Sequence, residues 1–89
     1  MKIKIRVNVT ADHIRHGQRN DSFYCPIALA LGQCGLGRVS VDKVSFEFLG
    51  SGFHTFLPIK ARRFVKNFDK SSRVKPFTFS FLFQSEKLS

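Results

Sequence analysis

The chain opens with a regular alternation of apolar and polar residues. From Lys2 to Val9, isoleucine or valine fills every odd position, and Lys, Arg or Asn fills every even one. A period of two places all the apolar side chains on one side of an extended chain. The pattern predicts a strand with a buried face and an outer face formed by a row of cations. Such a row suits either solvent or an anion. It also discourages edge-to-edge pairing between molecules, and this structural use is the one we favour.

Two short helices are predicted after this strand. Thr10 is suited to cap the first helix, and Gly17 is suited to end it. Cys25 caps the second helix, and Pro26 takes its first position, where the missing N–H of proline costs nothing. The five residues after Pro26 are all apolar, which favours a buried helix that ends at about Gln33.

Short strands are predicted in the middle of the chain. Valines hold the odd positions 39 and 41, whereas Val44, Phe46 and Phe48 hold even ones. A turn at Asp42-Lys43 would make the two halves a hairpin, and a bulge in one continuous strand is the alternative. A glycine-rich turn and an extended segment over 53–57 follow.

The last third of the chain predicts a helix that begins at Pro58 and a closing strand over 74–83. Apolar residues at helical spacing form one stripe of the helix: Leu57, Ala61, Phe64, Val65 and Phe68. Four phenylalanines alternate on one face of the closing strand. We therefore predict a single α+β domain over 1–89, with a mainly antiparallel, Phe-rich sheet, two to three helices on one face, and a frayed tail over 84–89.

Composition adds a strong positive charge to this picture. The chain of 89 residues has 15 Lys and Arg against 6 Asp and Glu, a net charge of +9. Such a balance favours an anionic partner, such as nucleic acid, nucleotides, anionic lipid or an acidic protein face. A charged surface that only keeps the chain soluble is the alternative. Most of the 11 phenylalanines, beside one tyrosine and no tryptophan, are assigned to the core.

Two stretches are candidate ligand-binding sites. Between residues 58 and 75, seven cations accompany one anion. Such a face binds phosphates because each neutralised phosphate releases counterions and because arginine can donate two hydrogen bonds to one phosphate. Four of these cations share the polar side of the predicted helix: Arg62, Arg63, Lys66 and Lys70. A second site is the polar loop that opens onto the N-terminus of the buried helix. Its candidate residues are Arg15, Arg19, Asn20, Tyr24 and Cys25.

Catalytic, metal and cofactor motifs are weak by comparison. Cys25 at a helix start is a candidate nucleophile with His13, His16 or His54 as its base, but no third positioned residue is recognisable. The histidine and cysteine spacing matches no zinc pattern, and the glycines form no phosphate loop. We therefore expect no catalytic residues, no metal and no cofactor, with a Cys25-dependent enzyme as the third functional alternative.

The cysteines and the apolar runs bear on location. At the two ends of one helix, Cys25 and Cys34 would lie about 13 Å apart, too far for a disulfide, which indicates a reducing compartment. No apolar run approaches the length of a membrane span, and no signal peptide is recognisable. We expect a cytoplasmic protein without a membrane partner, and the oligomeric state stays open.

Several motifs resemble those of small proteins encoded by tailed bacteriophages and prophages. They are Asp12-His-Ile-x-x-Gly17, Cys25-Pro-Ile-Ala-Leu-Ala-Leu31, Leu57-Pro58, Arg63-Phe64-Val65, Phe68-Asp69 and Val74-Lys-Pro-Phe77. The resemblance covers nearly the whole chain and implies no catalytic residue. It implies an accessory protein in the cytoplasm of an infected bacterium that counters host defence by sequestering a nucleic acid or nucleotide signal. The alternative is an inhibitor whose basic face docks on an acidic host protein surface, such as a nuclease complex of the CRISPR type.

Overall fold

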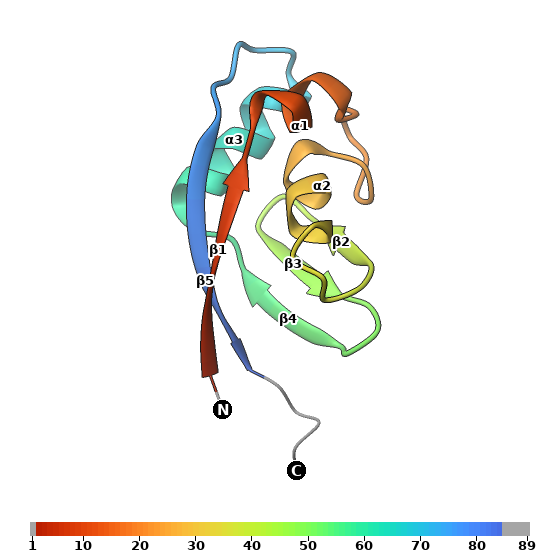
Figure 1. The fold of residues 1–89 in the computed structure, drawn as a ribbon. Coiled ribbons are helices and arrows are strands. Elements are labelled where there is room, and N and C mark those ends of the chain that lie inside the picture. Colours follow the sequence, from red (N-terminus) through yellow and green to blue (C-terminus); the bar gives the residue numbers. More distant parts are fainter. Residues whose placement is uncertain (1, 85–89) are drawn as a thin grey trace.

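The computed structural model describes residues 2–84, which fold into two antiparallel sheets and three helices (Figure 1). The elements are β1 (Lys2–Val9), α1 (Ala11–His16), α2 (Pro26–Gly32), β2 (Val39–Val41), β3 (Ser45–Phe48), β4 (Phe53–Phe56), α3 (Ile59–Asp69) and β5 (Phe77–Gln84). The predicted α+β class is confirmed. The strands are divided between a two-stranded ribbon, β1–β5, and a three-stranded sheet with the order β2-β3-β4.

The ribbon joins the first and the last strand of the fold. Its pairing runs without interruption from Lys2 opposite Gln84 to Val9 opposite Phe77, so odd-numbered residues of both strands share the inner face. This confirms the predicted alternation, although Ile3 is 49% exposed because the inner face is progressively less covered toward that end of the ribbon. β5 begins three residues later than predicted and includes Gln84. The remainder of the predicted tail, 85–89, lies outside the described residues.

The change of parity in the middle of the chain is a hairpin. β2 pairs antiparallel with β3, and the Asp42 N–H donates to the Ser45 carbonyl across the turn at 2.7 Å. This pairing excludes the continuous bulged strand. Val44 lies in the turn and is exposed, rather than forming part of β3. β4 then pairs antiparallel with the other edge of β3. The extended segment predicted over 53–57 is therefore a strand of this sheet.

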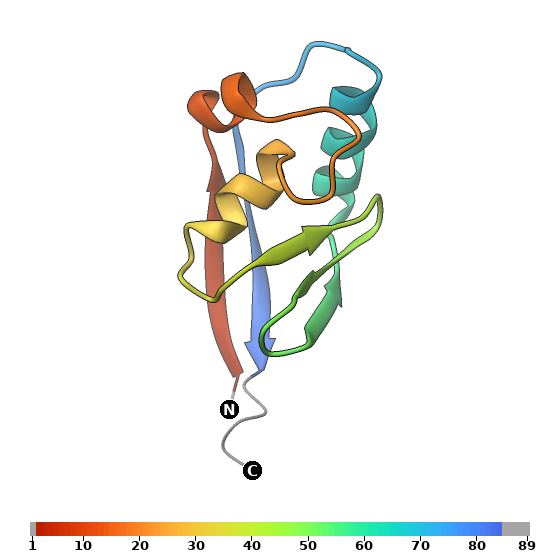
Figure 2. The same ribbon diagram turned by 90° about the vertical axis from the view of Figure 1, so that its right-hand side faces the viewer.

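The core lies between the ribbon, the three-stranded sheet and the helices (Figure 2). Phenylalanines join the two sheets: Phe46 and Phe81 meet edge to face at 5.0 Å between ring centroids, and Phe48 lies 6.0 Å from Phe81. Every residue of the predicted apolar stripe of α3 is buried, and Phe64 packs 4.9 Å from Phe77 of β5. The phenylalanines therefore hold the two sheets and α3 together, as their number indicated.

The start of α2 is fixed by a cap and by a close contact. The Cys25 sulfur accepts the Ala28 N–H at 3.4 Å, and Pro26 is the first helical residue, as predicted. Gly17 ends α1 and packs against Pro26. A Cβ on Gly17 would lie 2.6 Å from Pro26 Cδ, so no larger residue fits without moving the helix.

His13 has a structural use that accounts for its burial. Its Nδ1 accepts the Thr10 N–H at 2.9 Å, and Thr10 in return caps the His13 N–H, which completes a capping box. Because Nδ1 is an acceptor, the ring proton sits on Nε2 and is donated to Gln33 Oε1 at 3.0 Å. His13 thus ties α1 to the end of α2, which leaves both its ring nitrogens engaged.

Candidate functional site

The structure distributes the predicted loop residues over three separate hollows rather than one site. Arg15 and Arg19 border a hollow beside Phe68 of α3, and the Arg19 guanidinium lies 5.9 Å from the Phe68 ring. Asn20 and Cys25 belong to a second hollow at the start of α2. Tyr24 belongs to a third, formed with the far side of α2 and the start of β2. Neighbours in sequence are therefore not neighbours around a common ligand.

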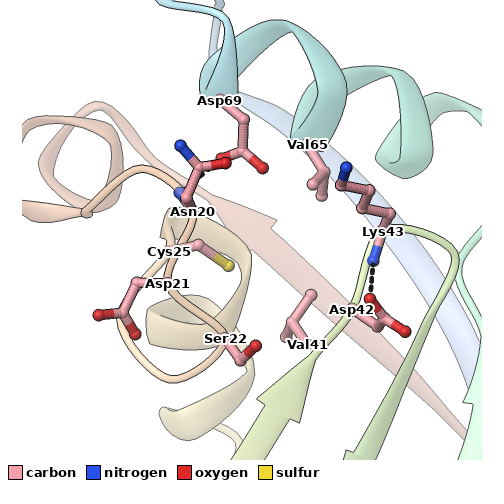
Figure 3. A pocket seen from close by; sticks show the side chains of 9 residues that line it. All are labelled: Asn20, Asp21, Ser22, Cys25, Val41, Asp42, Lys43, Val65 and Asp69. Atoms are coloured by element: carbon pink, nitrogen blue, oxygen red, sulfur yellow. Dashed lines mark hydrogen bonds between the residues drawn. The ribbon is translucent and has the colours of Figure 1, made fainter.

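The hollow at the start of α2 is acidic (Figure 3). Its volume is about 150 Å³. It is lined by Asn20, Asp21, Ser22, Cys25, Val41, Asp42, Lys43, Val65 and Asp69. Asp69 accepts the Asn20 N–H at 2.9 Å, and Asp21 accepts the N–H groups of the two residues before Cys25. Three carboxylates against one lysine repel an anion, so we do not place an anionic ligand here.

The Cys25 thiol faces this hollow but is 6% exposed. Burial away from water raises the pKa of the thiol, and the N–H groups of Ala28 and Ile27 oppose that shift only in part. None of the candidate histidines lines the hollow. His13 is engaged in its capping box, and His54 lies on the exposed face of β4. The arrangement favours a protonated, packed thiol over an activated nucleophile.

Alkylation kinetics test this interpretation of Cys25. In the folded protein at neutral pH we expect iodoacetamide to modify Cys25 at least about tenfold more slowly than in denaturant, because the reactive thiolate is scarce and covered. Mass spectrometry of the native protein and of a Cys34→Ala variant separates the two thiols. Modification of native Cys25 as fast as, or faster than, the unfolded thiol would contradict a packed, inert cysteine and favour the enzyme alternative.

The four predicted cations of α3 are not equivalent. Arg62 is half-buried; its Nε donates to the Leu57 carbonyl at 2.8 Å and its guanidinium lies 5.8 Å from the Phe56 ring. The Arg62 guanidinium is therefore partly engaged in contacts within the protein and is less available to a ligand. Arg63, Lys66 and Lys70 are exposed.

A second row of cations on the outer face of the ribbon lies close to α3. The even-numbered residues of β1 and β5 pair across this face: Lys2 with Gln84, Lys4 with Leu82, Arg6 with Ser80 and Asn8 with Thr78. The alternation in the sequence predicted the cations of β1, but their assignment to a structural role left them out of the predicted site. Nothing in the sequence pattern showed that β5 would extend this face.

Lys60 connects the ribbon to α3. Its Nζ donates to the Thr78 carbonyl of β5 at 3.0 Å, which places the first turn of α3 beside the ribbon. Arg63 and Lys70 follow Lys60 on the same helical stripe, three and ten residues later. A hollow of about 700 Å³ lies where the outer face meets the start of α3. Its lining residues are Lys4, Arg6, Pro58, Lys60, Thr78, Phe79 and Ser80.

We call this surface the basic face and define it by six cations. They are Lys2, Lys4 and Arg6 of β1, Lys60 and Arg63 of α3, and Lys70, which directly follows α3. Within residues 2–84 the one ion pair joins Arg15 to Asp12, so no carboxylate neutralises these six cations. The other described carboxylates line the hollow at the start of α2 or the hollow over the three-stranded sheet. Among the described residues, no carboxylate lines the hollow between the outer face of the ribbon and the start of α3.

Comparisons with protein-family models, with curated proteins and with solved structures gave no match. In the part of the chain that the structure describes, no helix is long and apolar enough to cross a membrane. The same residues contain no group of three or more His, Cys, Asp or Glu side chains placed to hold a metal ion. The geometry and charge of the basic face therefore carry the functional argument.

Proposed function

We propose that this protein is a non-enzymatic binder of a phosphate-rich ligand, nucleic acid or a nucleotide signal, and that the basic face is its contact surface. The observation that carries the proposal is the collection of six cations, without a carboxylate partner among residues 2–84, on the ribbon and the adjoining stripe of α3. Each phosphate neutralised by such a face releases condensed counterions, which drives binding. Arg6 and Arg63 can each offer two parallel hydrogen bonds to one phosphate.

The absence of a carboxylate of residues 2–84 from the lining of the hollow between the ribbon and α3 supports a ligand over a merely solvated surface. Solubility requires charges of either sign anywhere on the surface, and gains nothing from separating them. The Ser80 hydroxyl lines the hollow shared with Lys4, Arg6 and Lys60 and adds a donor suited to a phosphate oxygen. A protein that sequesters its target in an infected bacterium, as the phage-type motifs imply, needs such a surface and no catalytic residue.

A salt titration of binding tests the proposal. Fluorescence anisotropy with labelled DNA and RNA of about 20 nucleotides, and with a cyclic dinucleotide, would be measured from about 50 to about 200 mM salt. If the six cations meet phosphates of a nucleic acid, log K should fall against log salt with a slope of about −4 to −5. Absence of binding to every probe at the lowest salt, or binding that ignores salt, would contradict the proposal.

A further inference from the structure

We infer that the partner of the basic face is double-stranded DNA and that the β1–β5 ribbon enters its major groove; this inference rests on the proposed function. The first ground is shape. The major groove of B-DNA admits a two-stranded β-ribbon as well as an α-helix. β1 and β5 are each eight residues long and pair throughout, which gives an element of about 26 Å.

The second ground is the chemistry of the outer face. Seven of its eight residues are hydrogen-bonding side chains, and none is acidic. Arginine reads guanine through two parallel hydrogen bonds, and Asn or Gln reads adenine in the same way. Arg6 lies near the middle of β1, and Asn8 accepts the Thr78 hydroxyl at 3.0 Å, which leaves the amide N–H groups of Asn8 available for a base. Leu82 is 56% exposed and offers an apolar contact for a thymine methyl.

The third ground is what flanks the ribbon. α3 lies beside β5 (Figure 1), where Lys60 contacts the strand directly. The helical spacing places Arg63 and Lys70, the residue after α3, on the stripe that begins at Lys60. Cations at the border of an inserted ribbon meet the phosphate backbone, which fixes orientation, while the ribbon itself meets base edges. The basic face thus divides into a part that reads bases and a part that binds phosphates.

The same face is poorly suited to the other nucleic acids. Single strands are bound by stacking their bases on aromatic side chains, and none of the eight outer residues is aromatic. The exposed aromatic residues lie elsewhere, before α2 and on β4. The major groove of an RNA duplex is deep and narrow and does not admit a ribbon. The occupant that fits both the shape and the chemistry is duplex DNA.

The inference is tested with one sequence in three forms: duplex DNA, single-stranded DNA and duplex RNA, each of about 20 nucleotides per strand. We expect the full chain to bind duplex DNA at least about tenfold more tightly than either other form. Dimethyl sulfate probing of the complex should show guanine N7 atoms, which lie in the major groove, protected from methylation.

Two charge-preserving variants separate base reading from phosphate binding. Arg6→Lys keeps the charge but loses the guanidinium fork, so the salt slope should stay unchanged while protection of a guanine N7 weakens. The matched variant Arg63→Lys, on the phosphate side, should keep that protection. Equal affinity for single strands or RNA, or protection confined to the minor groove, would overturn the inference and leave the proposed function intact. Absence of binding to all three forms would overturn the inference, and the proposed function falls with it only if the cyclic dinucleotide also fails to bind.

Discussion

Replacing Phe48 with alanine is expected to lower the free energy of unfolding by about 4 kcal/mol, the cost of deleting a fully buried aromatic side chain. Phe48 is 0% exposed and sits where the two sheets meet. Its ring lies between 5.8 and 6.4 Å, centroid to centroid, from four other phenylalanines. They are Phe46, Phe53, Phe81 and Phe83. The free energy of unfolding of a small domain is about 5 to 15 kcal/mol in total, so we expect this variant to be only marginally folded.

Phe56→Ala is the matched control, because it removes the same side chain from a neighbouring strand. Phe56 is 64% exposed, and its ring contacts the guanidinium of Arg62. Its removal should cost no more than about 1 kcal/mol. Urea denaturation followed by circular dichroism measures both variants against the natural chain. Equal destabilisation by the two substitutions would contradict the placement of the core between the ribbon and the three-stranded sheet.

The elements of the fold were predictable because their signals are local. The alternation over residues 2–9 and the apolar stripe of α3 each define one buried face within a few residues of sequence. The division of the strands into two sheets was not predictable in this way. It depends on the pairing of β1 with β5, which lies near the other end of the chain, and no periodicity within either strand encodes its partner.

The candidate site was predicted in part, for a related reason. Exposed cations on α3 follow from the helical pattern, and Arg63, Lys66 and Lys70 are exposed as expected. The partial commitment of Arg62 to the Leu57 carbonyl arises from the path of the chain before the helix, which the stripe does not reveal. The loop residues 15–25 were grouped because they are close in sequence, whereas a turn with Asn20 at φ 56° directs them into different hollows.

The largest functional effect is expected from Lys4→Gln combined with Arg6→Gln. Both side chains lie on the outer face of the ribbon and line the hollow shared with α3. At about 0.1 M salt, removing one cation that displaces a condensed counterion should weaken binding about tenfold, so the pair should weaken DNA binding about a hundredfold. The salt slope should become shallower by about two, because two charges that displace condensed counterions from the DNA are gone.

The control for net charge is Arg38→Gln combined with Lys43→Gln. This pair also removes two positive charges, but Arg38 lies over the Phe23 ring at 4.6 Å, and Lys43 borders the acidic hollow at the start of α2. Neither contributes to the basic face. Removal of these two charges should change affinity less than about threefold, through the weak long-range field alone.

The measurement that decides the account is the affinity of these two double variants for the same duplex DNA, compared over a range of salt. We expect a large decrease in affinity for Lys4→Gln with Arg6→Gln only, which would place the DNA on the ribbon. Equal decreases in the two variants would mean that net charge alone attracts the DNA. A larger decrease in Arg38→Gln with Lys43→Gln would move the binding surface away from the ribbon and contradict the account.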